Sequence, residues 1–170
     1  NINFNPDQMH ELKIAAWMHD IGKVTTPVEV VEKAKKLQTI FDRIEYVDLR
    51  MCFILEQMEK HFLNKKIKVL QNGSDPNEIS ALEGEHKVKS QKVMEIRDFI
   101  NQCNNPGEFL EDEKIARLEE ISTMTWKNFD GIEKSFLDED ELLNLSIRRG
   151  SITESERKKM QNHAAVTLKM

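Results

Sequence analysis

"DLRMCFILEQMEKHFLNKKIKVLQNGSDP", residues 48–76, decides the fold, because it joins a long apolar seam to a turn. The apolar residues recur at steps of three, four and seven, which is the spacing of one face of a helix or of a heptad seam. The seam begins upstream of this stretch, and its members are Val30, Ala34, Leu37, Phe41, Ile44, Met51, Ile54 and Met58. No glycine or proline interrupts it before the loop at 72–76, so we predict one long helix that ends there.

Two further helical stretches follow that loop. The first covers about 78–103 and ends at the breaker "NNPGEF". Its apolar face is made of Val93, Ile96, Ile100 and Cys103. The second runs from about 112 to 127, and the acidic segment "FDGIEKSFLDEDELLNL" after it fits no single element. Since the stretches on either side of the 72–76 loop both have apolar seams, we predict that they pack as an antiparallel helical hairpin.

The N-terminal segment has clear helix boundaries. Asn5 is suited to the N-cap, with Gln8 as its capping-box partner, and the helix is expected to run to about Asp20. Gly22 is the expected stop, since glycine tolerates the left-handed conformation that ends many helices. Apolar residues cover two neighbouring faces, so we expect this helix end to be buried, and His19 with it.

Two more helix starts lie further along. Thr26 is a candidate cap with Glu29 as its partner, at the start of the long seam. Near the other end, Gly150 is expected to turn the chain, and Thr153 is expected to cap a last helix with Glu156 as its partner.

Composition narrows the class of protein. Charged residues make up 32% of the 170 residues and aromatic residues only 6%, which favours helix over sheet. The net charge of −5 argues against a partner made of DNA or RNA. No apolar run is long enough for a membrane span and no signal-peptide pattern is present, so we expect a cytoplasmic protein. Cys52 and Cys103 are then interpreted as reduced core thiols, with a secreted disulfide as the alternative.

"MHDIGKVTTP", residues 18–27, places two candidate metal ligands side by side. The imidazole of His19 and the carboxylate of Asp20 suit Fe, Mn or Zn, and Mg less well. Two ions about 3.5–4 Å apart can activate a bridging water and clamp a phosphoryl group. Lys23 could then hold a phosphate oxygen as a point charge. The alternative is a chance dipeptide: a satisfied histidine, a surface acid, and a lysine that balances the helix dipole.

"AAWMHDIGKVTTP", residues 15–27, closely resembles the core motif of the HD superfamily of metal-dependent phosphohydrolases. The form HDIGK with a proline soon after it is typical of the HD-GYP branch. "IRRGSITESERKKMQNHAAVTLKM", residues 147–170, resembles the next block of that branch, with His163 at the motif histidine. The flanking stretches "EKAKKLQTIFDRI" and "NLSIRRGSITESER" resemble a subtype in which a helical insertion separates the two blocks.

The resemblance implies an all-α fold: an incomplete HD-domain-like core from 1–34 and 146–170, with an antiparallel helical hairpin inserted at 35–145. It implies that the metal ligands are His19, Asp20 and His163, that Asp20 bridges two divalent ions, and that Asp20 and Lys23 are catalytic. The ions expected are iron or manganese, with zinc or magnesium as alternatives. The substrate expected is a phosphodiester, a cyclic dinucleotide of the cyclic di-GMP type, in bacterial signalling.

Parts of the family pattern lack a counterpart here. The family's first histidine and its later HHE and GYP blocks do not occur in this sequence, so we expect a partial or inactive domain. One alternative is a non-catalytic helical signalling module with a degenerate metal site and a homodimer through the hairpin. Another is a helical interaction protein in which the HD pair is accidental. The remaining histidines, His10, His61 and His86, are interpreted as solvated surface residues.

Overall fold

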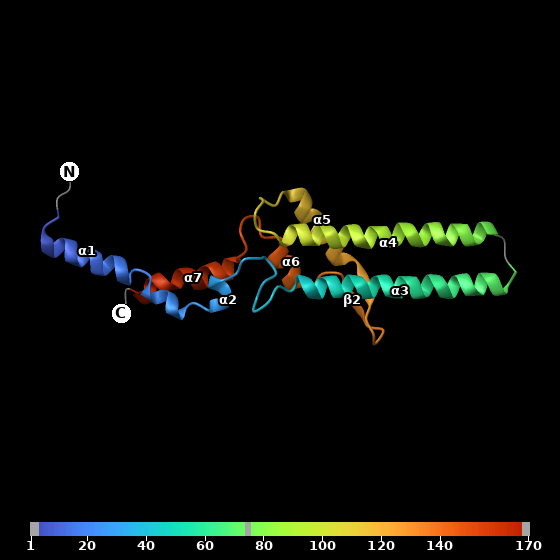
Figure 1. Ribbon diagram of the computed structural model, residues 1–170, viewed down its shortest axis with the longest axis horizontal. Coiled ribbons are helices and arrows are strands. Elements are labelled where there is room, and N and C mark those ends of the chain that lie inside the picture. Colours follow the sequence, from blue (N-terminus) through green and yellow to red (C-terminus); the bar gives the residue numbers. More distant parts are fainter. Residues whose placement is uncertain (1–3, 74–75, 168–170) are drawn as a thin grey trace. The chain divides into compact units, whose positions relative to one another are not determined.

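The computed structural model describes residues 4–73 and 76–167, and the surroundings of their side chains up to residue 162. It is 68% helix, with seven α-helices and one two-stranded sheet in the described part (Figure 1). The chain divides into two units. We call Asn1–Ala34 with Ile152–Met170 the motif unit, and Lys35–Ser151 the hairpin unit.

Two long helices dominate the hairpin unit. α3 (Ile44–Gln71) and α4 (Pro76–Asn104) run antiparallel and pack along their length (Figure 1). Both carry their buried apolar residues on one face, as the three- and four-residue spacing requires. The predicted helical hairpin is therefore confirmed.

The predicted start of the first hairpin helix is wrong. The seam was expected to be helical from Val30 onward, but α2 (Val28–Val31) is a short helix of its own, and residues 32–43 are irregular. The backbone N–H of Leu37 donates to Asn104 Oδ1 at 2.8 Å, and that of Lys36 donates to the Asn104 carbonyl at 3.2 Å. These tertiary hydrogen bonds take the place of helical ones, so Lys36 and Leu37 can be buried without being in a helix.

A smaller layer packs beside the hairpin. It contains α5 (Asp112–Thr123), strands β1 (Thr125–Lys127) and β2 (Glu133–Ser135), and α6 (Glu139–Leu145). The helix predicted to reach residue 127 ends at Thr123, and residues 125–127 pair with β2 instead. The acidic segment that fitted no single element thus forms a strand and a short helix, and the all-α prediction holds only for the bulk of the fold.

The apolar core lies in the hairpin unit. Its largest fully buried apolar side chains are Leu37, Met51, Ile100, Leu118, Leu137 and Leu145. Arg50 donates to both carboxylate oxygens of the buried Glu141, at 2.7 and 2.9 Å, so this charged pair is bidentate. Cys103 is a free thiol in this core as predicted, whereas Cys52 is exposed, which corrects its assignment as a core residue.

The motif unit contains α1 (Pro6–Met18), the 3₁₀ turn η1 (Ile21–Thr25), α2 and α7 (Glu154–Thr167). The predicted capping box of Asn5 and Gln8 is present, and so is that of Thr153 and Glu156. Gly150, at the end of the hairpin unit, has a φ of +81°, the left-handed turn expected of it. No described helix is long and apolar enough to span a membrane.

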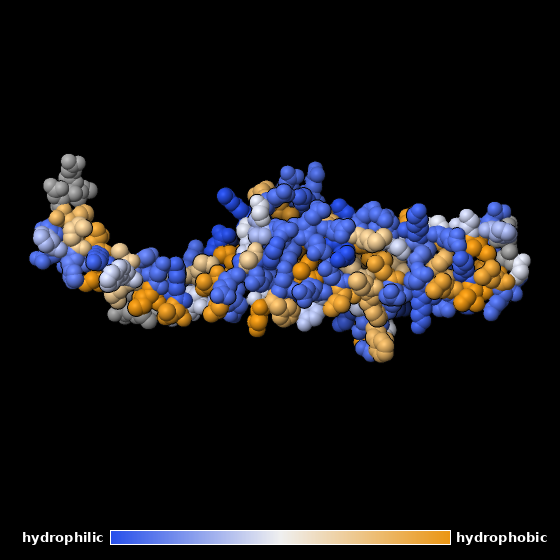
Figure 2. Space-filling model, in the orientation of Figure 1, coloured by the Kyte–Doolittle hydropathy of each residue, from blue (hydrophilic) through white to orange (hydrophobic). Residues whose placement is uncertain are grey.

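Three predictions about the first half of the motif unit are wrong. Gly22 is not the stop of the first helix, because α1 ends at Met18 and Gly22 lies inside η1. α1 buries none of its residues, and its large apolar side chains are exposed (Figure 2). The sequence pattern shows that a face is suited to packing, but not that a partner covers it. Thr26 does not cap α2, because Pro27 occupies the N-cap position and the Thr26 hydroxyl is buried without a hydrogen-bond partner among the described residues.

Candidate metal centre

His19, Asp20 and Lys23 lie together where α1 ends and η1 begins. The Nε2 atom of His19 is 3.1 Å from Asp20 Oδ2, and the Lys23 ammonium is 2.7 Å from the same oxygen. The tight 3₁₀ turn brings Lys23 back over Asp20, three residues earlier. The structure therefore brings together the three residues of this segment that the sequence singled out.

The imidazole of His19 has a defined orientation. Its Nδ1 atom lies 2.6 Å from the carbonyl oxygen of Ala16, which can only accept, so an N–H at Nδ1 donates to that carbonyl and Nε2 faces Asp20. Metal-ligating histidines usually hold their second nitrogen in this way. Two neighbouring donors on a first-row ion lie about 3.0 Å apart when each bond is about 2.1 Å. The observed 3.1 Å between Nε2 and Oδ2 fits that geometry.

This pair is open to solvent. The side chains of His19 and Asp20 are 67% and 42% exposed, so the expectation that His19 is buried is wrong. The reason is that α1 buries no residue on any of its faces. An exposed ion pair contributes little to stability, so the fold does not depend on the contact between these two side chains.

His163, the third predicted ligand, lies outside the residues whose side chains are described. Its helix, α7, packs against η1 and α2 of the same unit. Among the described residues, no three His, Cys, Asp or Glu side chains are close enough together to hold a metal ion. Two donors of the predicted set are therefore described, and they fit a divalent ion by their chemistry and spacing.

Lys33 and Glu156 join the two sequence blocks of the motif unit. The Lys33 ammonium donates to both carboxylate oxygens of Glu156 at 2.9 Å, and the Lys33 side chain is only 1% exposed. Burial alone would raise the pKa of Glu156, but hydrogen bonds from Thr153 and Lys33 outweigh it and lower that pKa. The sequence predicted the Thr153 cap, yet nothing in "EKAKKL" distinguishes Lys33 from the other lysines.

The other histidines divide into two groups. His10 and His61 are exposed, as predicted. His86 is not a solvated surface residue: its side chain is 19% exposed, stacks on Phe62 with ring centroids 4.5 Å apart, and places Nε2 at 2.7 Å from Glu59 Oε2. The spacing of Glu59 and Phe62, three residues apart, already places them on one face of α3. The contact with His86 could not be predicted from that spacing, because it depends on the antiparallel register of α3 and α4.

No family model, curated protein or solved structure matches this chain.

Proposed function

We propose that the motif unit is part of a metal-dependent phosphohydrolase of the HD type, acting on a phosphodiester of the cyclic di-GMP kind. One observation carries this proposal. An imidazole nitrogen and a carboxylate oxygen 3.1 Å apart, open to solvent, lie beside an ammonium group 2.7 Å from that oxygen. This combination suits a divalent ion and a phosphate together.

In this proposal, His19 and Asp20 hold iron or manganese, and His163 on α7 contributes a third ligand. Zinc or magnesium are the alternatives. A bound ion of this kind supplies a water of lowered pKa and positive charge for the phosphoryl oxygens. Support for His163 comes from the packing of α7 against η1, together with the Lys33–Glu156 contact that holds the start of α7 to the chain after α2.

Lys23 has a separate role in the proposal. Its ammonium lies beside Asp20 Oδ2 and is 48% exposed, so it can reach an anion arriving from solvent. A lysine acts on phosphate as a mobile point charge. We infer that it positions the substrate phosphate and contributes little to metal affinity.

The test is manganese binding by the purified chain, measured by titration calorimetry, with hydrolysis of bis(p-nitrophenyl) phosphate followed in parallel. Asp20→Asn, His19→Asn and His163→Asn are each expected to weaken Mn²⁺ binding at least tenfold and to abolish hydrolysis. His10→Asn, which replaces an exposed histidine on α1, the helix that precedes the motif, is the matched control and is expected to change neither. Equal Mn²⁺ affinity in the wild type and in Asp20→Asn would refute the proposal.

Lys23→Gln separates binding from turnover. It is expected to slow hydrolysis by more than tenfold while Mn²⁺ affinity changes less than threefold. Equal losses of both would show that Lys23 supports the metal site instead. Metal binding by the wild type without any hydrolysis would favour the non-catalytic signalling module over the enzyme.

A further inference from the structure

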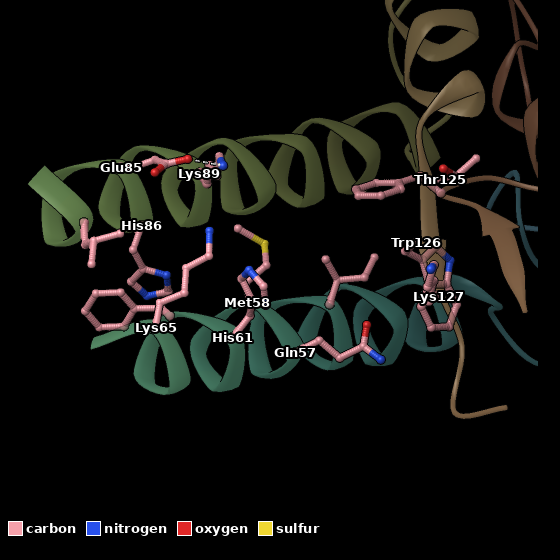
Figure 3. Close-up of a pocket in the computed structure, with 14 residues that line it drawn as sticks. Gln57, Met58, His61, Lys65, Glu85, His86, Lys89, Thr125, Trp126 and Lys127 are labelled. Carbon is pink, nitrogen blue, oxygen red and sulfur yellow. Dashed lines mark hydrogen bonds and ion pairs between the residues drawn. The ribbon is translucent and has the colours of Figure 1, made fainter. Parts of the chain in front are cut away.

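A groove of about 350 Å³ lies in the hairpin unit, between α3, α4 and β1 (Figure 3). Its floor is apolar and is formed by Ile54, Met58, Phe62, Leu82, Trp126 and Phe136. Small-molecule sites are concave, mostly apolar and commonly about 300–1,000 Å³ in volume, with a few polar groups placed at the edge. The groove belongs to a different unit from His19 and Asp20, so nothing about it depends on the proposed function.

Both ends of the groove are held in place by contacts within the unit. At one end, His86 stacks on Phe62 and is paired with Glu59. At the other, Trp126 packs edge-on against Phe53, with centroids 5.6 Å apart, and its Nε1 donates to the Ser135 carbonyl at 3.1 Å. Because these aromatic side chains are already ordered, a ligand would lose little binding free energy in arranging them.

The rim of the groove is cationic. Lys65 from α3, Lys89 from α4 and Lys127 from β1 line it, and Glu85 is the one acidic residue among its described lining residues. Glu85 is paired with Lys89, as Figure 3 shows. The side-chain ammonium groups of Lys65 and Lys127 make no hydrogen bond or ion pair with the described residues. The groove is thus locally positive in a chain of net charge −5.

The charges converge on the groove from both helices. The pKa of Glu85 is lowered, first by the hydrogen bond and charge of Lys89 and further by the charges of Lys65 and His61. Lys65 and His61 on α3 line the same groove as Glu85 on α4. An anion in the groove would meet the same cations.

We propose that this groove binds a small amphipathic anion, with its apolar body on the aromatic and aliphatic floor and its anionic group against the lysines of the rim. The rim complements negative charge, and the volume suits a small molecule. A second copy of the chain fits less well. A two-fold interface pairs a surface patch with itself, and this rim carries three lysines against one glutamate, so the two copies would bring an excess of positive charge together.

Decanoate is the probe, and 1-decanol is its neutral match, both below the concentration at which decanoate forms micelles. The binding signal is the fluorescence of Trp126 in a Trp17→Phe background, since Trp17, the other tryptophan, is exposed on α1 and would report unrelated contacts. Decanoate is expected to give a saturable change, with 1-decanol binding at least tenfold more weakly. Equal binding of the two probes would overturn the proposal.

Lysine variants test which positive charges contribute to decanoate binding. The double variant Lys65→Gln, Lys127→Gln is expected to weaken decanoate binding at least tenfold. The matched control is Lys60→Gln, Lys68→Gln, which removes two exposed lysines of α3 that do not line the groove and is expected to leave affinity within twofold. An equal loss in both double variants would show a diffuse charge effect and would overturn the site.

A third variant tests the floor without changing charge. Leu82→Phe narrows the groove at a half-buried position and is expected to weaken decanoate at least fivefold while the helical circular dichroism is kept. Unchanged affinity would overturn the proposed position of the apolar body. Sedimentation velocity completes the test: a dimer that dissociates in the Lys65→Gln, Lys127→Gln variant would assign the groove to a second copy instead.

Discussion

The two units of this chain differ in what their buried residues do. The hairpin unit holds the apolar core, from Leu37 to Leu145, and its stability comes from removing that surface from water. In the motif unit, α1 buries nothing, and the pair of His19 and Asp20 stands open to solvent. The comparison teaches that the residues with metal-binding chemistry lie outside the region that stabilises the fold.

A pair of lysines shows the same contrast on a smaller scale. Lys33 and Lys36 are three residues apart, and both are buried. In the motif unit, Lys33 meets a carboxylate, that of Glu156. In the hairpin unit, Lys36 donates to a neutral acceptor, the Leu145 carbonyl, at 2.9 Å. A buried charge is costly unless it is paired, so these two lysines should respond to substitution in opposite ways.

The largest effect expected concerns the core. Ile100 is completely buried in the hairpin unit, whereas Ile14 on α1 is 43% exposed. Ile100→Ala should lower the free energy of unfolding by about 2–5 kcal/mol, since it removes buried methylenes and leaves a cavity. Ile14→Ala should change it by less than about 0.5 kcal/mol, as is usual for a surface position. Urea unfolding followed by circular dichroism measures both.

An equal loss in the two isoleucine variants would contradict the comparison, because it would mean that α1 contributes to the same cooperative core. A loss of unfolding free energy confined to Ile100→Ala would show that the stability of the hairpin core does not depend on the apolar residues of α1.

Sequence reasoning succeeded where the pattern repeats locally. The apolar spacing predicted α4 and most of α3, and the capping boxes of α1 and α7 were predicted from residues three apart. His19, Asp20 and Lys23 also lie within one turn, so their meeting needed no tertiary information. Each of these predictions depends on short-range geometry that the backbone imposes.

Sequence reasoning failed where a contact with a residue distant in the sequence determines the local structure. In the irregular segment 32–43, the backbone N–H groups of Lys36 and Leu37 donate to Asn104, which lies 67 positions beyond Leu37. The apolar faces of α1 predicted burial that the described structure does not contain. The groove could not be predicted from the sequence. Trp126 and Lys127, which line it, fall in a segment that was predicted to be helical, whereas they belong to strand β1 in the structure. Periodicity carries no information about such contacts.

The second prediction concerns the buried charge of the motif unit. Lys33→Met should destabilise α7 by about 1–3 kcal/mol, because it leaves the half-buried carboxylate of Glu156 without its partner. The measurement is amide hydrogen exchange of the first turns of α7. Lys158→Met, which removes an exposed lysine of the same helix, is the control and should leave exchange unchanged. Equal exchange in the two variants would contradict the structural role of the Lys33–Glu156 pair.

The smallest expected effect is on the free energy of unfolding at Lys36. Unlike the effect at Lys33, it is recognised by its dependence on pH. Burial lowers the pKa of Lys36 from its ordinary value of 10.5, with Cys103 opposing this and Lys114 adding to it. Between that lowered pKa and 10.5 the unfolded chain binds more protons than the folded one, so the contribution of Lys36 to stability rises with pH in this window. Burial raises the pKa of Cys103 above 9.0, which gives a slope of opposite sign.

Lys36→Met is compared with wild type in a Cys103→Ala background, because Lys36 and the Cys103 thiol shift each other's pKa and the titration of the thiol would not cancel. Methionine is similar in length and carries no charge, so the variant should differ from wild type by less than about 1.5 kcal/mol at pH 7. Any advantage of the variant should shrink as pH rises toward 10, because wild-type Lys36 then becomes neutral and its burial costs less. Urea unfolding from pH 7 to 10 measures the difference. A difference that stays constant across this range would show that Lys36 keeps its charge in the core.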